Sequence, residues 1–129
     1  MADWNHIIAH WQEASDKDRI TMNNLFKSKD YSWALFLGHL VIEKLLKAHC
    51  VKHNKAHPIF THDLLRLASL SGLELSQEQE DWLDHISTFN INARYDNYKQ
   101  DFYKRCTRPY TEMWIERVEI LRKWLIEAF

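Results

Sequence analysis

Residues 33–51 read WALFLGHLVIEKLLKAHCV, a long and almost entirely apolar stretch. At helical spacing its apolar side chains point to nearly every side, and such a helix is buried in a protein core. One polar line remains, made of His39, Glu43 and Lys47 at successive i,i+4 positions. Polar groups on a buried helix need hydrogen-bonding partners. The stretch therefore predicts a central helix, from about Tyr31 to His53, whose polar line has a structural or functional role.

Helical periodicity continues on both sides of this stretch. Residues 90–97, NINARYDN, lack a clean helical period and are rich in Asn, which favours turns and caps. We expect one all-α domain over residues 1–129, an up-and-down bundle of about five helices with short connections. The remaining predicted helices, each with its capping residue, cover about residues 3–27 (Asp3), 62–70 (Thr61), 76–89 (Ser76, with Gln79 completing a capping box) and 108–128 (Thr107), with a short piece over 98–105.

Composition narrows the class of protein. Hydrophobic residues make up 46% and charged residues 27%, as in ordinary globular domains rather than disordered chains. A net charge of −1 argues against a general polyanion-binding protein, although it leaves room for a local basic groove. Charged side chains interrupt the apolar stretch, so we expect no membrane span. Two cysteines and no recognisable signal peptide lead us to expect a cytoplasmic protein.

Three motifs follow one another in a characteristic order: GHLVIEKLLKA at 38–48, THDLLRLA at 61–68 and FNINARYDNY at 89–98. Together they resemble the HEPN domain, a small all-helical domain named for higher eukaryotes and prokaryotes nucleotide-binding proteins. The resemblance covers about the whole chain and implies a helical bundle, usually a two-fold dimer. It also implies a minimal nucleotidyltransferase partner, because in prokaryotes the two proteins are often encoded side by side as toxin and antitoxin.

Some proteins of this family are metal-independent ribonucleases, whose motif is an Arg followed four to six residues later by a His. Arg94 matches the Arg, but the residues after it, YDNYKQD at 95–101, contain no His. The resemblance therefore implies a nucleotide-binding or nucleotidyltransferase-partner domain, and we expect a binding protein rather than an enzyme.

Arg94, Tyr95 and Tyr98 form the candidate ligand-binding site. A guanidinium group is a planar fork suited to phosphate, and a Tyr ring can stack on a base. We expect Glu43 to orient Arg94 from across the bundle, with Lys47 beside it. Alternatively, Arg94 pairs with a core carboxylate, the tyrosines pack, and the polar line is a solvated strip. The downstream residues Lys99, Lys104, Arg105 and Arg108 form either a phosphate-attracting patch or a solvated face.

His39 and His62 are the candidate catalytic residues, because an imidazole titrates near neutrality and suits general acid–base chemistry. The alternative for His62 is a structural role at the start of the helix that follows. His49 and His53 stand at i,i+4 and His57 follows in the loop, but no H-E-x-x-H pattern or nearby set of Cys and His residues completes a metal site. We therefore expect neither a metal nor a cofactor.

Three hypotheses follow for function. The leading one is a HEPN-type nucleotide- or RNA-binding module, homodimeric, that acts with a minimal nucleotidyltransferase in a toxin–antitoxin-like pair. The second is a HEPN ribonuclease toxin in which His39 or His62 replaces the missing His. The third is a purely structural dimeric interaction domain without a ligand.

Overall fold

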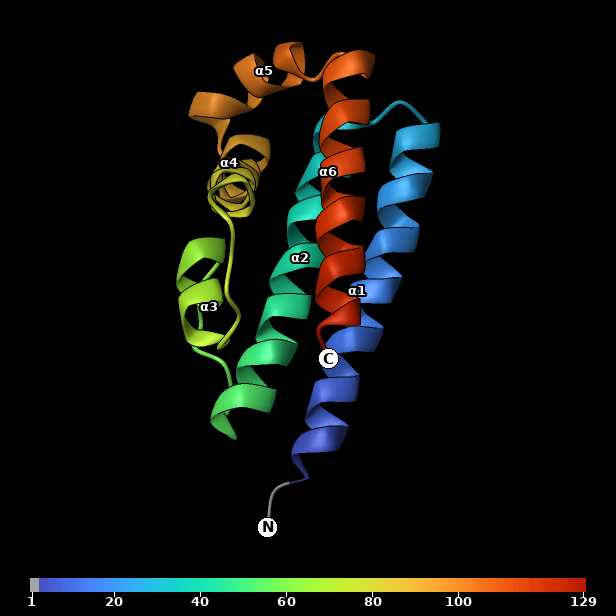
Figure 1. Cartoon of the computed structure of the whole chain (residues 1–129). Coiled ribbons are helices and arrows are strands. Elements are labelled where there is room, and N and C mark those ends of the chain that lie inside the picture. Colours follow the sequence, from blue (N-terminus) through green and yellow to red (C-terminus); the bar gives the residue numbers. More distant parts are fainter. Residues whose placement is uncertain (1–2) are drawn as a thin grey trace.

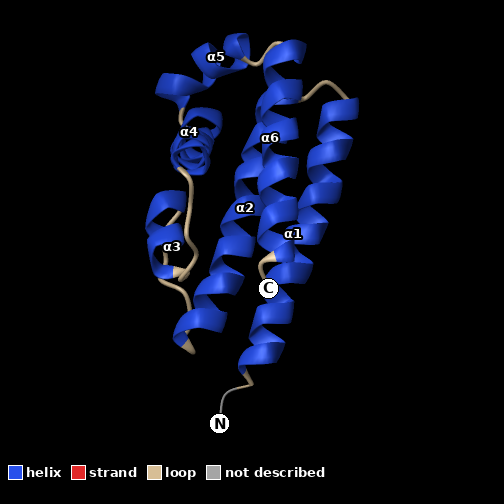
Figure 2. Ribbon diagram, in the orientation of Figure 1, coloured by secondary structure: helices blue, strands red, loops and turns tan. Residues whose placement is uncertain are grey.

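A computed structural model of the chain describes residues 3–129, which are helical apart from short connections and contain no strand (Figures 1 and 2). The predicted all-α bundle is confirmed, with six helices where about five were expected. The helices are α1 (Trp4–Lys27), α2 (Tyr31–Asn54), α3 (Leu64–Leu70), α4 (Gln77–Arg94), α5 (Asp96–Arg105) and α6 (Arg108–Glu127).

Helix α2 is the centre of the bundle. In Figure 1 it runs lengthwise beside α1 and α6, whereas α4 is seen end-on, so α4 crosses the long helices rather than following them. α2 packs against each of the other five helices. More than half of its 24 residues are buried, as a helix that is apolar nearly all round should be.

Close approach of α1 and α6 to α2 has a visible cause at Gly38. A Cβ atom built there would lie 3.2 Å from Cγ2 of Val118 and 3.3 Å from Sδ of Met22, so the missing side chain lets three helices meet. One turn away, the buried Ser15 hydroxyl donates a 2.8 Å hydrogen bond to the backbone carbonyl of Val41. This bond satisfies a polar group inside the α1–α2 interface, where an unpaired hydroxyl would be costly.

Most of the predicted helix starts are confirmed, and one is wrong. Asp3, Ser76 and Thr107 cap their helices, and Ser76 forms the predicted capping box with Gln79. Asp30 occupies the N-cap of α2 without a capping hydrogen bond, since its carboxylate accepts from the Ser28 hydroxyl instead. The cap of α3 is Asp63 rather than Thr61. The Asp63 carboxylate accepts hydrogen bonds from the backbone amides of Leu65 and Arg66. The Thr61 hydroxyl lies before the helix and accepts from the backbone amide of Asp63.

The segment predicted as a turn, residues 90–97, is mostly helical. α4 continues through Asn90 to Arg94, and α5 begins only two residues later, at Asp96. Asn90 and Ala93 are buried in the core, so packing outweighs the weak helix propensity of the asparagines. Tyr95 alone separates the two helices. Its extended backbone (φ −93°, ψ 130°) ends α4 and starts α5 in a new direction.

None of the helices within residues 3–129 is both long enough and apolar enough to cross a lipid bilayer.

Candidate functional site

The polar line of α2 is buried, so the alternative of a solvated strip is wrong. Its centre is Glu43, whose residue is 3% exposed. Oε1 of Glu43 accepts a 2.7 Å hydrogen bond from Nδ1 of His62, and Oε2 accepts a 3.1 Å bond from Nζ of Lys47. Nε2 of His39 lies 3.7 Å from the same Oε1. A buried carboxylate is tolerated only when its charge and lone pairs are satisfied, and the hydrogen bonds from His62 and Lys47 do so.

His39 is wholly enclosed and cannot touch a ligand from this position. Its Nε2 lies 2.9 Å from the backbone carbonyl of His62, and since a carbonyl only accepts, Nε2 carries the proton. Burial lowers the pKa of His39 below its ordinary 6.5, outweighing the opposing effects of this hydrogen bond and of the Glu43 charge. His39 is therefore neutral at physiological pH. Its geometry fits a positioning residue that holds the backbone of His62.

His62 is the candidate catalytic residue that a ligand can reach. Its side chain is 38% exposed. Glu43 accepts the proton on Nδ1, which leaves Nε2 facing outward without a hydrogen-bonding partner among the described residues. His62 does not cap α3, but its ring and its backbone carbonyl are hydrogen-bonded to Glu43 and His39 two residues before that helix begins, which fits the structural role given as the alternative for it. It lines a hollow of about 310 Å³ between the start of α3 and α4, together with Asp63, Asp84, Ser87, Thr88, Asn90 and Ile91.

The side chain of Lys47 is buried and its charge is paired. Its ammonium group donates to Glu43 and lies 5.2 Å from the centre of the Trp11 ring, and the residue is 6% exposed. The charge of Lys47 therefore offsets that of Glu43 rather than projecting into solvent.

Arg94 lies on the surface at the last turn of α4. Its Nε donates a 3.0 Å hydrogen bond to the backbone carbonyl of Asn90, and its guanidinium carbon lies 5.5 Å from the centre of the Phe36 ring and 5.6 Å from that of Tyr95. No carboxylate within residues 3–129 forms an ion pair with it. The predicted Glu43–Arg94 pair is therefore wrong, because Glu43 is already saturated by buried partners. The alternative pairing of Arg94 with a core carboxylate is wrong for the same reason.

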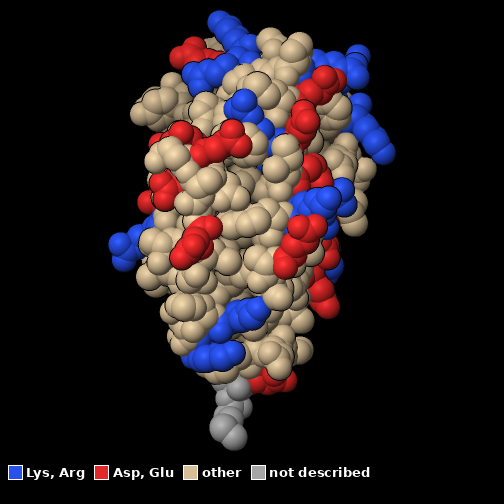
Figure 3. Space-filling view, in the orientation of Figure 1, with Lys and Arg blue, Asp and Glu red and all other residues tan. Residues whose placement is uncertain are grey.

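Aromatic and basic side chains continue from Arg94 toward α5. The Phe36 ring packs edge-on against Trp33 at 5.8 Å, and Nζ of Lys99 lies 5.5 Å from the centre of the Trp33 ring. Tyr95 and Tyr98 are both more than half exposed. Figure 3 shows basic side chains gathered at this end of the molecule, where α5 lies, with acidic ones interspersed. Three of the predicted ligand-binding residues, Arg94, Tyr95 and Tyr98, thus share one exposed corner, whereas Glu43 and Lys47 are buried.

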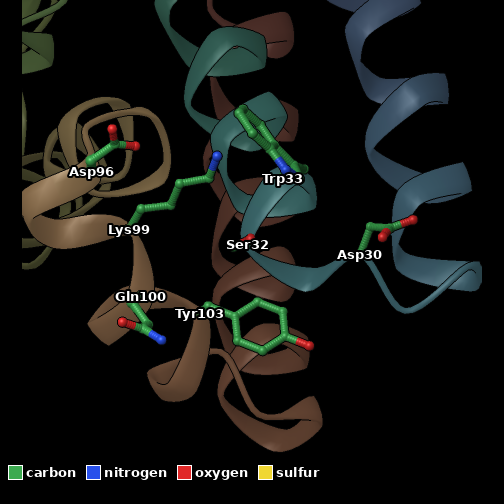
Figure 4. A pocket seen from close by; sticks show the side chains of 7 residues that line it. All are labelled: Asp30, Ser32, Trp33, Asp96, Lys99, Gln100 and Tyr103. Carbon is green, nitrogen blue, oxygen red and sulfur yellow. The ribbon is translucent and has the colours of Figure 1, made fainter.

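Beside Lys99 the surface is hollowed into a pocket of about 420 Å³, lined by Asp30, Ser32, Trp33, Asp96, Lys99, Gln100 and Tyr103 (Figure 4). Trp33 and Tyr103 were not among the predicted site residues, and Trp33 was expected in the core. The spacing of Trp33 and Phe36, three residues apart at the start of a helix, was an available signal, because it puts two rings one turn apart on one side.

Other reactive groups do not add to these sites. Burial raises the pKa of Cys50 to about 11 and that of Cys106 to about 12, so both thiols are protonated and unreactive. Within residues 3–129, no three His, Cys, Asp or Glu side chains are grouped so that they could hold a metal ion.

The buried histidines predict a fall in stability at mildly acidic pH. Burial lowers the pKa of His39, His49 and His85, so between neutral pH and these lowered values the unfolded chain binds protons that the folded protein does not. The free energy of unfolding should fall as the pH drops through 6.5, the ordinary histidine value. Urea unfolding at several pH values from about 7.5 to about 5.5 measures this slope. His49→Gln should reduce the slope and the exposed control His10→Gln should not; equal slopes in all three proteins would contradict the prediction.

Comparison with known proteins identifies the family and a similar fold. The family described as HEPN domain matches residues 8–128. A crystal structure of TT1696 from Thermus thermophilus has a similar fold, with a TM-score of 0.81 and 16% sequence identity over 95% of this chain and 98% of that one. A search of curated proteins gave no match. Since the family match spans nearly all of the residues that build the bundle, this protein belongs to the HEPN domain family.

Proposed function

We propose that this protein binds a nucleotide or the phosphate backbone of RNA at the exposed corner of α4 and α5. The observation that carries the proposal is the state of Arg94, a surface guanidinium with no carboxylate partner in the described chain. Membership of the HEPN family supports a nucleotide- or RNA-related role. Arg94 binds phosphate, and Tyr95 and Tyr98 stack on the base or hydrogen-bond to the sugar.

The contacts of Arg94 suit it to this role. The hydrogen bond from Nε to the Asn90 carbonyl fixes the side chain, which leaves the two terminal amino groups for a phosphate. A guanidinium fork binds two phosphate oxygens at once, and such charge-assisted pairs are stronger than neutral hydrogen bonds. The flanking rings of Phe36 and Tyr95 restrict the side chain further and stabilise its charge. The fork is thus already oriented before a ligand arrives.

In this proposal Glu43 and Lys47 act from the interior. They do not orient Arg94 directly. Glu43 joins α2 to His62 and Lys47 lies against the Trp11 ring of α1, and these contacts hold α2, which carries Phe36, the ring beneath the guanidinium group.

Removing Arg94 should weaken binding. Isothermal titration calorimetry at low salt with ATP and with a short single-stranded RNA should give heat with the wild-type protein. Arg94→Ala should weaken the affinity by about tenfold or more, because a hydrogen bond to a charged group contributes about 1.5–3 kcal/mol. Arg94→Lys should also bind more weakly, since an ammonium group lacks the fork.

Arg122→Ala is the matched control, because it removes the same charge from α6, where Arg122 pairs with Asp16 of α1. An equal loss in this control would mean that only net charge matters. Absence of heat from the wild-type protein with every ligand would exclude the proposal.

We infer further that the protein is a homodimer that acts with a minimal nucleotidyltransferase in a toxin–antitoxin-like pair. This part is supported by family membership alone, through the gene arrangement common in the family. Light scattering should give twice the mass of one chain, and co-expression with a nucleotidyltransferase encoded next to it should give a complex that survives gel filtration. A monomer that elutes alone would argue against both points.

A second candidate function is metal-independent cleavage of RNA, favoured by the contact between Glu43 and His62. A buried carboxylate 2.7 Å from Nδ1 fixes the imidazole and leaves Nε2 to accept a proton from a ribose 2′-hydroxyl. The 2′-oxygen would then attack the adjacent phosphorus while the bond from phosphorus to the 5′-oxygen of the next nucleotide breaks. That oxygen would take up a proton from water, so the products would be a 2′,3′-cyclic phosphate and a 5′-hydroxyl. The fully buried His39 would act only by holding the His62 backbone.

RNA degradation in the presence of a chelator tests this second function. Wild-type protein should shorten total RNA, whereas His62→Gln and Arg94→Ala should leave it intact and the exposed control His10→Gln should behave like wild type. If RNA survives equally with wild-type protein and with either site variant, the ribonuclease hypothesis is removed.

A further inference from the structure

Along the surface from the end of α4 to α5, two aromatic rings lie between two cations. We call the four residues Arg94, Phe36, Trp33 and Lys99 the α2–α5 strip. The Arg94 guanidinium carbon lies 5.5 Å from the centre of the Phe36 ring, the Phe36 and Trp33 rings are 5.8 Å apart, and Nζ of Lys99 lies 5.5 Å from the Trp33 ring. The two positive charges are therefore separated by both rings, not gathered at one point.

This spacing bears on the size of the ligand. A mononucleotide whose phosphate is held by Arg94 presents one base and leaves Lys99 without an anion. A single-stranded oligonucleotide carries a phosphate at every residue and a base beside each one, so it can occupy both cations at the same time. Proteins that bind single strands combine cations along the backbone with aromatic side chains beneath the bases. The α2–α5 strip combines the same two kinds of side chain, with a cation at each end and two rings between.

The pocket beside Lys99 adds a place for a base. Its volume of about 420 Å³ lies in the range of small-molecule sites, roughly 300–1,000 Å³. Figure 4 shows Trp33 and Tyr103 at opposite ends of it, with Ser32 between them and Gln100 at one side. The Tyr103 residue is 71% exposed, so its ring is open to a ligand. The two rings offer stacking surfaces, and the Gln100 amide offers hydrogen bonds to a base edge.

The charges of the pocket limit which part of the ligand enters it. Asp30 and Asp96 line the pocket together with Lys99, so an anionic phosphate inside it would meet two carboxylates. A neutral base that carries hydrogen-bond donors fits better. The phosphate then stays outside, where the extended Lys99 side chain can reach it.

We propose that this pocket is a second subsite, which binds an unpaired base of single-stranded RNA while Lys99 contacts the neighbouring phosphate. This inference rests on the proposed function, because it takes Arg94 as the site of another phosphate of the same strand. It narrows the ligand from any nucleotide to a single-stranded oligonucleotide of at least two residues.

A length series of 5′-phosphorylated oligoadenylates tests the second subsite. With wild-type protein the affinity should rise by about tenfold from the mononucleotide to the trinucleotide, because stacking one base on an aromatic side chain contributes on the order of a tenfold gain. Lys99→Ala and Trp33→Ala should each remove most of this gain and leave the mononucleotide affinity within about twofold. Trp33→Phe should retain part of the gain, and Lys123→Ala, an exposed lysine on α6, should retain all of it.

The outcomes separate this inference from the proposed function. Equal affinities for mononucleotide and trinucleotide, or a length gain that survives both Lys99→Ala and Trp33→Ala, would overturn the second subsite while leaving nucleotide binding at Arg94 intact. Loss of mononucleotide binding in Arg94→Ala, together with loss of the length gain in Lys99→Ala and Trp33→Ala, would support both. Absence of binding by every oligonucleotide would remove both. Circular dichroism of each variant verifies that the helices are retained, and the exposed Lys99 provides the variant least able to disturb folding.

Discussion

The carboxylate of Glu43 lies in the middle of the most buried helix, and its need for partners shapes the surrounding structure. It draws Nδ1 of His62 to one oxygen and Lys47 to the other, while His39 holds the His62 backbone from one turn away. The connection between α2 and α3 is thereby joined to α2 through both the ring and the backbone carbonyl of His62. Because α3 begins at Leu64, only two residues later, the position of α3 against the bundle follows from how this single charge is satisfied.

Two groups of polar side chains therefore contact α2, one buried around Glu43 and one on the surface at Arg94. The charges of the interior one, around Glu43, are neutralised by its own members, and its most exposed side chain is that of His62. The exterior one begins at Arg94, whose charge is held by a backbone carbonyl and aromatic rings rather than by an acid. A cation held in this way keeps its affinity for anions, whereas a cation in an ion pair has lost most of it. This difference is why we place ligand binding outside the bundle, at the end of α4.

Much of the fold could be predicted from the sequence, because helical periodicity and capping residues report on local structure. The polar line of α2 and the cap at Ser76 are examples. The site was harder, because its contacts join residues distant in sequence: nothing in the spacing of Glu43, His62 and Arg94 indicates which of the two partners the carboxylate takes. The helical state of Asn90 was missed since burial, which single-residue propensity does not contain, outweighs the turn preference of asparagine. Trp33 was misplaced because an aromatic residue at the edge of an apolar run fits a core and a surface equally well.

Tyr95, the one residue between α4 and α5, has a further significance. Arg94 is the last residue of α4 and Lys99 belongs to α5, so the separation of the two cations is governed by the backbone torsions of the residue that joins their helices. The phosphate spacing that the surface can match is thus encoded in two dihedral angles rather than in the side chains themselves. The register of a bound strand would in this way be a property of the main chain.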